Sequence, residues 1–246
     1  MQDTKPKLSI VLPTYKEKEN LAIFVPQIEA EFKDIPIEII IVDDNSRDGT
    51  RELADELHKK FRNVSLIERA GLLGIGSALR DGYNSAHGEF ILSSDADLSF
   101  VPSDMRTLYG KIQTGFDMVL GYKIVDTAQT EERRKKILTQ EIMLPVGKFC
   151  NWIVRVISGV GGLREYNTNF RIIRSSTWKK FRTTEDRNFF LFETIFRAYR
   201  SGAKIGEIPV TFRARKFGES KLNFFQQAPK YFLDLVRLVF FERSSR

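Results

Sequence analysis

The sequence predicts an α/β protein with a mostly parallel β-sheet that is covered by helices on both faces. Through roughly the first 125 residues, short apolar runs rich in Ile and Val alternate with longer segments of helical period. The apolar runs are nearly continuous, which is typical of parallel strands buried on both faces. The expected strands are 8–13, 37–44, 64–68, 89–97 and 117–123.

Helices are expected between these strands, and the second half of the chain changes character. A charge run, TEERRKK, precedes a long segment at 137–160, and a last strand at 205–212 leads into a basic loop. Residues 224–241 place apolar side chains on one stripe and polar ones on another, as an amphipathic helix does. The other helices are expected near Asn20 to Phe32, Thr50 to Phe61, Gly76 to Ala86, Ser103 to Thr114 and Phe190 to Arg200.

The length of the chain bounds its domain organisation. A chain of 246 residues forms one sizeable domain with a full core more readily than two independent domains. We expect a single domain over residues 1–222, with halves 1–125 and 126–222, and an amphipathic C-terminal helix within 223–246. Hydrophobic residues make up 42% of the chain and charged residues 29%, as in ordinary soluble globular proteins.

The small number of Cys and His residues restricts the metal chemistry. A single Cys excludes an internal disulfide framework, and with only two His residues no Cys/His zinc cluster can form. We therefore expect a reducing compartment. A metal here would have oxygen ligands, which favour Mg²⁺ or Mn²⁺.

The formal net charge of +7 indicates an anionic partner. Nucleic acid, an acidic membrane surface and a phosphorylated substrate all fit, and charge alone does not choose among them. The N-terminal stretch MQDTKPKLSIV has no apolar region before the first strand, and no uninterrupted apolar run reaches about 18 residues. We expect neither a secretory signal nor a transmembrane helix.

Polar and charged residues follow the ends of the predicted strands. Ligands of parallel α/β sheets bind outside the carboxyl ends of the strands, so these residues form the candidate site. They are Pro13, Thr14 and Tyr15, then Asp43 and Asp44, then Asp95, Ala96 and Asp97, and finally Lys123.

Asp95 and Asp97 lie one residue apart at the end of a strand. If the chain leaves extended geometry there, both carboxylates reach one hard cation, which in turn bridges to a diphosphate. The alternative is that these carboxylates only cap a helix or form a turn. The pair alone leaves both interpretations open.

Asp43 and Asp44 open a turn, DDNSRDGT, between a strand and a helix. Asn, Ser and Gly residues explain the turn, and Thr50 is a candidate helix cap. Two consecutive aspartates exceed what the turn needs, and they suit hydrogen bonds to a ribose or a base edge. The nearby Gly71, Gly74 and Gly76 lack the third glycine of a dinucleotide-binding motif, so we interpret them as a tight turn.

A basic segment contains Arg213, Arg215, Lys216 and Lys221 around Gly218 and Ser220. It is either a solvated basic loop or a mobile loop that grips phosphate. Flexible glycine, a hydroxyl and several cations together favour the second interpretation.

Apolar stripes in 137–160 and 224–241 have two interpretations as well. Such stripes more often pack in a core than contact a membrane. Flanking cations, among them Arg133, Lys230 and Arg237, make an interfacial site plausible, because apolar burial and attraction to anionic lipid add.

Together these motifs resemble those of family 2 glycosyltransferases, most closely the catalytic part of dolichol-phosphate mannose synthases and related polyprenyl-phosphate sugar transferases. The resemblance covers nearly the whole chain in order. It runs through LPTYKEKENL, VDDNSRDGT, LGIGSALRDG, SSDADLSFVP, the NTNFR segment and EIPVTFRARKFGESKL. It implies a GT-A fold, which is Rossmann-like, with a first half that grips a sugar nucleotide.

The resemblance also implies roles for individual residues. Asp95 and Asp97 would contact Mg²⁺ or Mn²⁺ on the diphosphate, and Ser99 stands where some members add a ligand. Lys123 replaces a common arginine near the phosphates. The nucleoside would be held by Pro13, Tyr15, Glu17, Val42 and Asp44, and the loop that closes over donor and lipid phosphate would use Arg215, Ser220 and Lys221. Asp43, Ala96, Arg171 and Arg213 lie in the same motifs and are expected to contact substrate.

The implied reaction is inverting transfer of a sugar from a nucleotide sugar to dolichyl or polyprenyl phosphate. GDP-mannose is the favoured donor and UDP-glucose the next. A phosphate acceptor is already anionic near neutral pH, so no general base is required. The expected location is the cytoplasmic face of a membrane, as a peripheral protein that docks through its amphipathic segments or through a membrane partner subunit, without nucleic acid.

Two rivals stay open. The first is a family 2 enzyme with a glycan or protein hydroxyl as acceptor, which needs a catalytic carboxylate, and Glu193 is the candidate. The second is a non-catalytic nucleotide or nucleic-acid binding module. Asp95 and Asp97 argue against the second, because carboxylates repel phosphates unless a metal intervenes.

Overall fold

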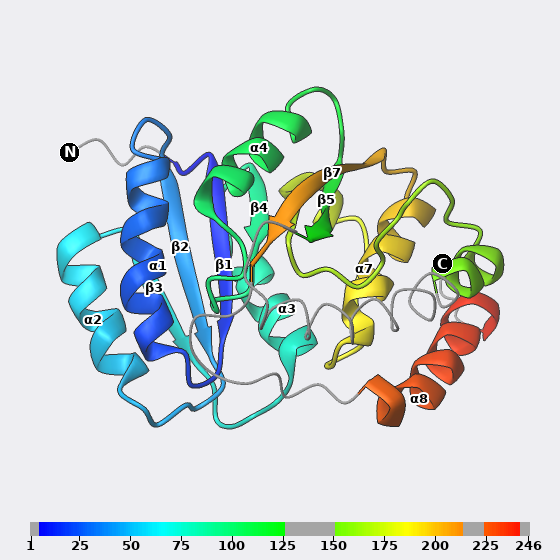
Figure 1. Ribbon diagram of the computed structural model, residues 1–246, viewed down its shortest axis with the longest axis horizontal. Helices are drawn as coiled ribbons and strands as arrows, with labels where there is room; N and C mark the ends of the chain where they lie inside the picture. The colour runs from blue at the N-terminus through cyan, green and yellow to red at the C-terminus, as the bar shows by residue number, and fades with distance from the viewer. Residues whose placement is uncertain (1–4, 126–150, 214–223, 242–246) are drawn as a thin grey trace.

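The computed structural model describes residues 5–125, 151–213 and 224–241, and these contain one seven-stranded sheet (Figure 1). Its strand order is β3-β2-β1-β4-β6-β5-β7. All neighbouring pairs are parallel except the two that involve β6. The predicted mostly parallel sheet is therefore confirmed. The strands are β1 (Leu8–Thr14), β2 (Ile37–Asp43), β3 (Val64–Glu68), β4 (Phe90–Ser93), β5 (Met118–Val125), β6 (Arg171–Arg174) and β7 (Ile205–Phe212).

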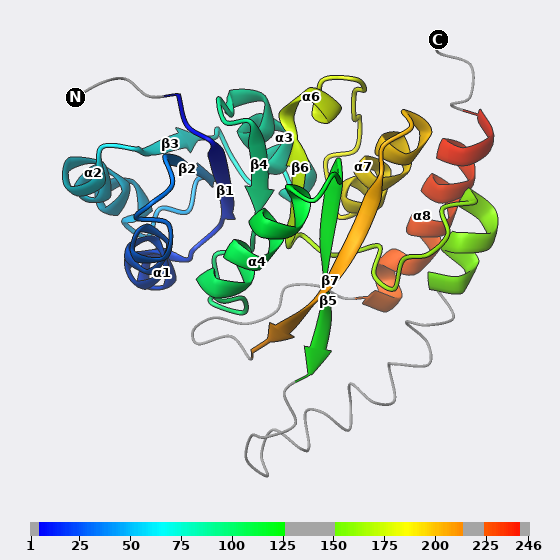
Figure 2. The same ribbon diagram turned by 90° about the horizontal axis from the view of Figure 1, so that it is seen from above.

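Helices cover both faces of the sheet, as Figure 2 shows. One layer holds α1 (Lys18–Glu31), α2 (Thr50–Phe61) and α4 (Pro102–Ile112), and the other holds α3 (Ile75–Ser85) and α7 (Phe189–Arg200). Side chains alternate along a strand, so Leu8, Ile10 and Leu12 of β1 join the core under α1, α2 and α4, whereas Val11 joins the core under α3 and α7. The sheet therefore has one apolar core on each face, and each core packs under one helix layer.

Strand β6 is the element that the sequence did not predict. It has four residues, begins and ends with arginine, and is followed by the short helix α6 (Ser175–Trp178). It lies between β4 and β5 and runs antiparallel to both. The segment that precedes β6 therefore arrives at the carboxyl end of β4, on the edge of the sheet where the site was expected.

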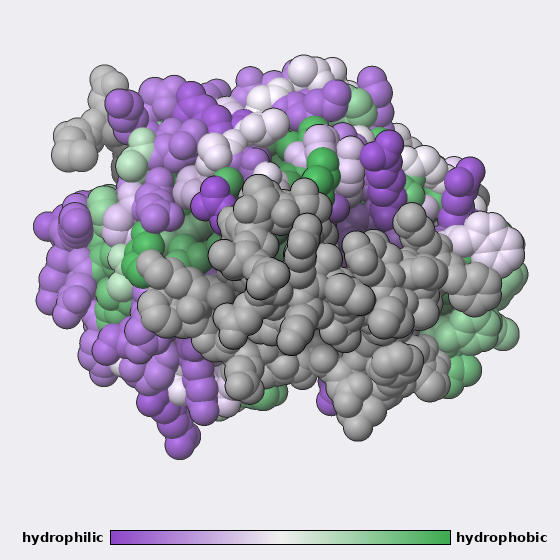
Figure 3. Space-filling model, in the orientation of Figure 1, coloured by the Kyte–Doolittle hydropathy of each residue, from purple (hydrophilic) through white to green (hydrophobic). Residues whose placement is uncertain are grey.

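The C-terminal helix packs by one face only. Helix α8 (Phe224–Val236) continues into the π-helical turn η1 (Arg237–Phe241), which confirms a helix over the predicted range. Leu235, Leu238 and Val239 are buried against the core of α7. Phe232, predicted on the same stripe as Leu235, is instead 48% exposed. Apolar side chains gather over α8 at the right-hand end of the molecule in Figure 3.

Candidate active site

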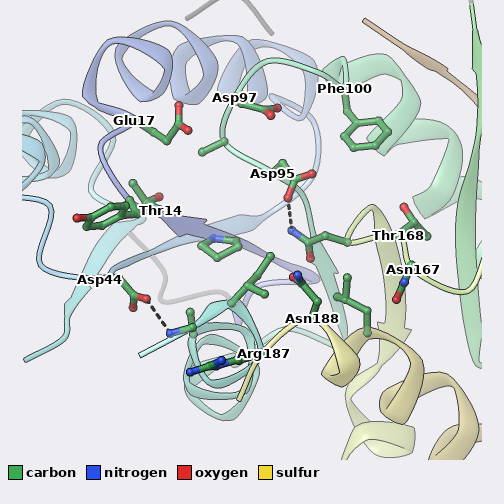
Figure 4. Close-up of a pocket in the computed structure, with 18 of the residues that line it drawn as sticks. Thr14, Glu17, Asp44, Asp95, Asp97, Phe100, Asn167, Thr168, Arg187 and Asn188 are labelled. Atoms are coloured by element: carbon green, nitrogen blue, oxygen red, sulfur yellow. Dashed lines mark hydrogen bonds between the residues drawn. The ribbon is translucent and has the colours of Figure 1, made fainter. Parts of the chain in front are cut away.

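A pocket of about 590 Å³ opens at the carboxyl ends of β1, β2 and β4 (Figure 4). The pocket therefore lies where the strand ends predicted it. Of the predicted site residues, its lining includes Pro13, Tyr15, Glu17, Asp44, Asp95, Ala96, Asp97 and Lys123.

Asp95 and Asp97 enter the pocket because the chain leaves extended geometry after β4, which ends at Ser93 rather than continuing to Asp97. Leu98 has a φ of 61°, a left-handed conformation that is unfavourable for a branched side chain. The Asp97 Oδ1 atom accepts a hydrogen bond from the Ser99 amide at 3.0 Å. Asp95 Oδ1 accepts one from the Asn169 side-chain amide, also at 3.0 Å.

The two carboxylates fit a divalent cation that shares its ligands with a substrate. No group of three or more His, Cys, Asp or Glu side chains able to hold a metal occurs within the described ranges. Mg²⁺ typically uses one or two carboxylates and completes its shell with phosphates and water. Asp95 and Asp97 facing a 590 Å³ pocket meet this requirement, whereas they do not suit a closed structural site.

Ser99 does not lie where a metal ligand would. Its side chain is fully buried, and its Oγ has no hydrogen-bond partner. The Ser99 backbone holds the Asp97 carboxylate and accepts a hydrogen bond from the Arg213 amide at 2.9 Å. The predicted contact of Ser99 with a cation is therefore corrected: Ser99 is fully buried and does not line the pocket.

Asp44 lines the pocket, as predicted for a strand end, and its carboxylate accepts several hydrogen bonds. Arg69 donates to its Oδ1, and the Leu73 and Gly74 amides donate to its Oδ2 at 3.1 Å each. Burial raises the pKa of Asp44, while hydrogen bonds from Gly74 and the charge of Arg69 oppose the shift. Asp44 thus holds the glycine-containing turn against the pocket.

Asp43 and Val42 support the fold around the pocket and are not among the residues that line it. Asp43 accepts hydrogen bonds from the Ser46 amide, at 2.9 Å, and from its hydroxyl, so it shapes the turn after β2. Val42 is fully buried in the core beneath α3. A substrate contact through the Val42 side chain is contradicted, because that side chain is fully buried and does not line the pocket.

Arg171 is also corrected. Its side chain is fully buried, and it donates to the carbonyl oxygens of Thr168 and Leu191. Burial lowers its pKa to about 10. Arg171 binds backbone and not substrate, and in doing so it ties the segment before β6 to α7.

The cations of the predicted phosphate region divide into two groups. Lys123 lines the pocket, and its Nζ lies 4.3 Å from the centre of the Phe212 ring. Arg213 is exposed, and it is absent from the pocket lining. Arg215, Ser220 and Lys221 lie outside the described residues, so their roles stay predictions.

Sequence reasoning missed the wall opposite the two aspartates. It consists of Asn167, Thr168 and Asn169 before β6, and Arg187 and Asn188 before α7. The sequence singled out Asn167 to Asn169 only as part of the NTNFR segment of the resemblance, with no role of their own. Arg187 had no local signal, because tertiary contacts alone carry it to the pocket.

Glu193 makes one of the tertiary contacts that hold the loop before α7. It does not lie where a catalytic base would reach a substrate in the pocket. The carboxylate is fully buried and accepts hydrogen bonds from the Thr184 and Glu185 amides at 3.0–3.1 Å. It also bonds Arg197 at 2.7 Å. The suggestion of Glu193 as a catalytic carboxylate is contradicted, because it faces the loop before α7 and does not line the pocket.

Comparison with known proteins decides the family. Residues 9–196 match the model of glycosyl transferase family 2. The chain belongs to this family. It is therefore a glycosyltransferase, and the GT-A fold expected from the sequence is confirmed by the solved structures below.

Two curated relatives share most of the chain. It is 31% identical over 220 residues to a dolichol-phosphate mannosyltransferase of Pyrococcus furiosus, which covers 88% of this chain but 59% of the relative. It is 28% identical over 228 residues to a polyprenol monophosphomannose synthase of Mycolicibacterium smegmatis, covering 87% and 80%.

Solved structures show the same fold at lower identity. Glucosyl-3-phosphoglycerate synthase of Mycobacterium tuberculosis with Mn²⁺, UDP and glucosyl-3-phosphoglycerate has a TM-score of 0.62 at 14% identity, covering 95% of this chain and 78% of its own. The same enzyme with Mg²⁺ and UDP has a TM-score of 0.66 at 15% identity, covering 94% and 79%.

Proposed function

We propose that this protein transfers a sugar, with mannose favoured, from a nucleotide sugar to the phosphate of dolichol or another polyprenol. The carrying observation is the pocket that joins Asp95 and Asp97 to the nucleoside end around Asp44. The relatives named as dolichol- or polyprenol-phosphate mannose enzymes support this acceptor, and their names favour mannose as the sugar. We therefore propose GDP-mannose as the donor before UDP-glucose.

Different residues of the pocket bind different parts of the donor. Tyr15 and Asp44 orient the nucleoside, and Lys123 lies toward the phosphates. Asp95 and Asp97 would hold a divalent cation, Mg²⁺ or Mn²⁺, which would offset the negative charge that develops on the leaving diphosphate. Arg213, with Arg215, Ser220 and Lys221 of the following segment, is proposed to bind the phosphates of donor and acceptor.

The reaction follows from the charge of the acceptor. An oxygen of the lipid phosphate forms a bond to the anomeric carbon while the bond to the nucleoside diphosphate breaks, and its electron pair leaves with the diphosphate. A phosphate monoester, with a second pKa of about 6, is largely ionised at neutral pH, so no group must remove a proton. No histidine lines the pocket within the described residues, which agrees with this chemistry.

The proposed acceptor is a membrane lipid, so the protein must bind at a membrane surface to reach it. Six exposed apolar side chains lie on α8, η1 and the neighbouring helix at 151–158: Trp152, Val156, Phe232, Leu233, Phe240 and Phe241. The two helices lie side by side in both ribbon views. In the described part of the chain no helix is long and apolar enough to span a bilayer. We propose peripheral attachment at the cytoplasmic face through these six side chains, the apolar patch, with a membrane partner subunit as the alternative route.

This function suggests a role for each of the three parts of the chain. Residues 1–125 serve the nucleotide sugar, residues 126–222 the acceptor, and the helix within 223–246 the membrane.

A matched pair of acceptors tests the proposal. Labelled GDP-mannose and Mn²⁺ are supplied with either polyprenyl phosphate or the corresponding polyprenol, and lipid-extractable label is measured. We expect product from the phosphate only. Equal transfer to the polyprenol would contradict the proposal, because a hydroxyl acceptor needs a base that this account does not assign.

A further inference from the structure

Asn169, in the segment that leads into β6, lies beside Asp95. In the antiparallel register of β4 and β6, Ser93 pairs with Arg171. Asp95 lies two residues after Ser93 and Asn169 two residues before Arg171, so the antiparallel pairing brings the two residues together just beyond the strand ends. The Asn169 Nδ2 atom donates to Asp95 Oδ1 at 3.0 Å, the bond that is dashed beside Asp95 in Figure 4. A residue of the segment that leads into β6 therefore contacts one of the two metal-site carboxylates.

Asn169 itself is held rigidly. Its backbone carbonyl accepts a hydrogen bond from the Ser93 hydroxyl at 2.7 Å, and the preceding carbonyl, of Thr168, accepts from the buried Arg171. The Asn169 side chain is 4% exposed and contributes to the pocket wall. The position of the amide is therefore set by β4 and β6 together and does not depend on a ligand.

The orientation of the amide is also set. Only the NH₂ group can face a carboxylate, so the Asn169 Oδ1 atom must point the other way. There it is buried without a hydrogen-bond partner. A buried carbonyl oxygen without a hydrogen-bond partner destabilises the folded protein. The orientation that makes the bond to Asp95 therefore lowers the stability of the fold. Such a cost is common where a side chain serves a functional site.

We propose that Asn169 is a positioning residue for the metal site, which fixes the rotamer of Asp95 before the cation and the donor arrive. The inference rests on the proposed function, since Asp95 and Asp97 must bind the cation. Groups that orient metal ligands from outside the coordination shell typically change metal affinity 10- to 100-fold when they are removed. We expect an effect of about tenfold here, because the amide holds one of the two carboxylates.

Mn²⁺ binding is the direct readout, measured by electron paramagnetic resonance with GDP or UDP present and without turnover. Two variants are compared with the wild-type protein. Asn169→Ala removes the donor, and Asn169→Leu removes the donor while filling the space and deleting the unpaired oxygen. We expect about tenfold weaker Mn²⁺ binding in both variants. Because Asn169→Leu keeps the packing, it should unfold at a temperature at least as high as Asn169→Ala.

The chain offers a close control in Asn63. Its Nδ2 atom donates to Glu29 Oε1 at 3.0 Å, and its Oδ1 is likewise buried without a partner. Neither Asn63 nor Glu29 lines the pocket. Asn63→Ala should therefore leave Mn²⁺ affinity unchanged.

Sugar transfer separates the positioning role from a purely structural one. With Asn169→Leu, the Mn²⁺ concentration for half-maximal rate should rise about tenfold while the rate at saturating Mn²⁺ recovers. If the wild-type protein binds Mn²⁺ and both Asn169 variants bind it equally tightly, the inference is overturned and the proposed function stands. If the wild-type protein with GDP and with UDP binds no Mn²⁺, the proposed function fails.

Discussion

Arg69 and Asp44 form a buried ion pair at the edge of the pocket, with their side chains 4% and 6% exposed. Arg69 also donates to Ser77 of α3 and to the Gly74 carbonyl. One guanidinium thus joins β2, the glycine-containing turn and α3. Removing one partner of a buried pair leaves the other charge uncompensated, which makes this pair a sensitive test of the site.

Replacing Arg69 by Gln should lower the free energy of unfolding by about 3–5 kcal/mol and raise the KM for the donor. Burial raises the pKa of Asp44 against the opposition of Gly74 and Arg69, so loss of Arg69 should raise it further. A group with a raised pKa contributes stability that is lost as pH rises through that pKa. The free energies of unfolding of the wild type and of Arg69→Gln should therefore come closer together as pH falls from 8 toward about 4, where Asp44 becomes protonated in both. Urea unfolding at several pH values measures it, and a difference that does not change with pH would refute the role of Asp44.

Asp97→Ala should abolish metal-dependent binding of the nucleotide and leave the fold intact. Asp97 is 3% exposed but reaches the pocket, and its loss leaves Asp95 alone to hold the cation. Titration calorimetry with GDP and UDP, in Mn²⁺ and in chelator, measures the effect. Asp55→Ala, on the exposed face of α2, is the control and should bind as wild type. Unchanged turnover of Asp97→Ala would rule out the metal assignment.

Glu193→Gln should reduce stability and not chemistry. The Glu193 carboxylate accepts from the Thr184 and Glu185 amides, and Gln keeps one acceptor oxygen. We expect a loss of about 1–3 kcal/mol in the free energy of unfolding. The kcat should fall much less than the roughly 10²- to 10⁴-fold loss that removal of a general base causes. A loss of that size without unfolding would restore Glu193 as a base and favour a hydroxyl acceptor.

Leu233→Glu should weaken attachment to membranes. Leu233 is 67% exposed on α8, in the apolar patch, and a buried carboxylate at a lipid surface is unfavourable. Co-sedimentation with anionic vesicles should show less bound protein, while nucleotide binding in solution is unchanged. Lys59→Gln makes the same change in net charge on α2, at the other end of the molecule, and should bind vesicles more strongly than Leu233→Glu. Equal binding by these two variants would argue against the patch.

Much of this arrangement could be predicted from local sequence. The apolar runs marked six of the seven strands, and Asp44, Asp95, Asp97 and Lys123 followed from their places at strand ends. Strand β6 could not be predicted, because it has four residues and begins with an arginine that is buried only through bonds to distant carbonyls.

The missed half of the pocket has the same cause. Arg187 and Asn188 reach it because Glu193, Arg80 and Ser77 hold the loop before α7, and no sequence spacing encodes those contacts. Asn169 joins the site only because the segment before β6 arrives at the carboxyl end of β4. The sequence motifs therefore predicted the side of the pocket formed at the ends of β1, β2 and β4, while packing determines the opposite wall.

The most direct test is transfer of labelled sugar to polyprenyl phosphate from three donors, GDP-mannose, UDP-glucose and UDP-N-acetylglucosamine, each with Mn²⁺ and with chelator. We expect lipid-extractable product from one donor, with GDP-mannose favoured, and its loss with chelator. Product that forms equally well in chelator would contradict the metal site at Asp95 and Asp97. With membranes supplied, the absence of product from all three donors would contradict the proposed transfer to a lipid phosphate.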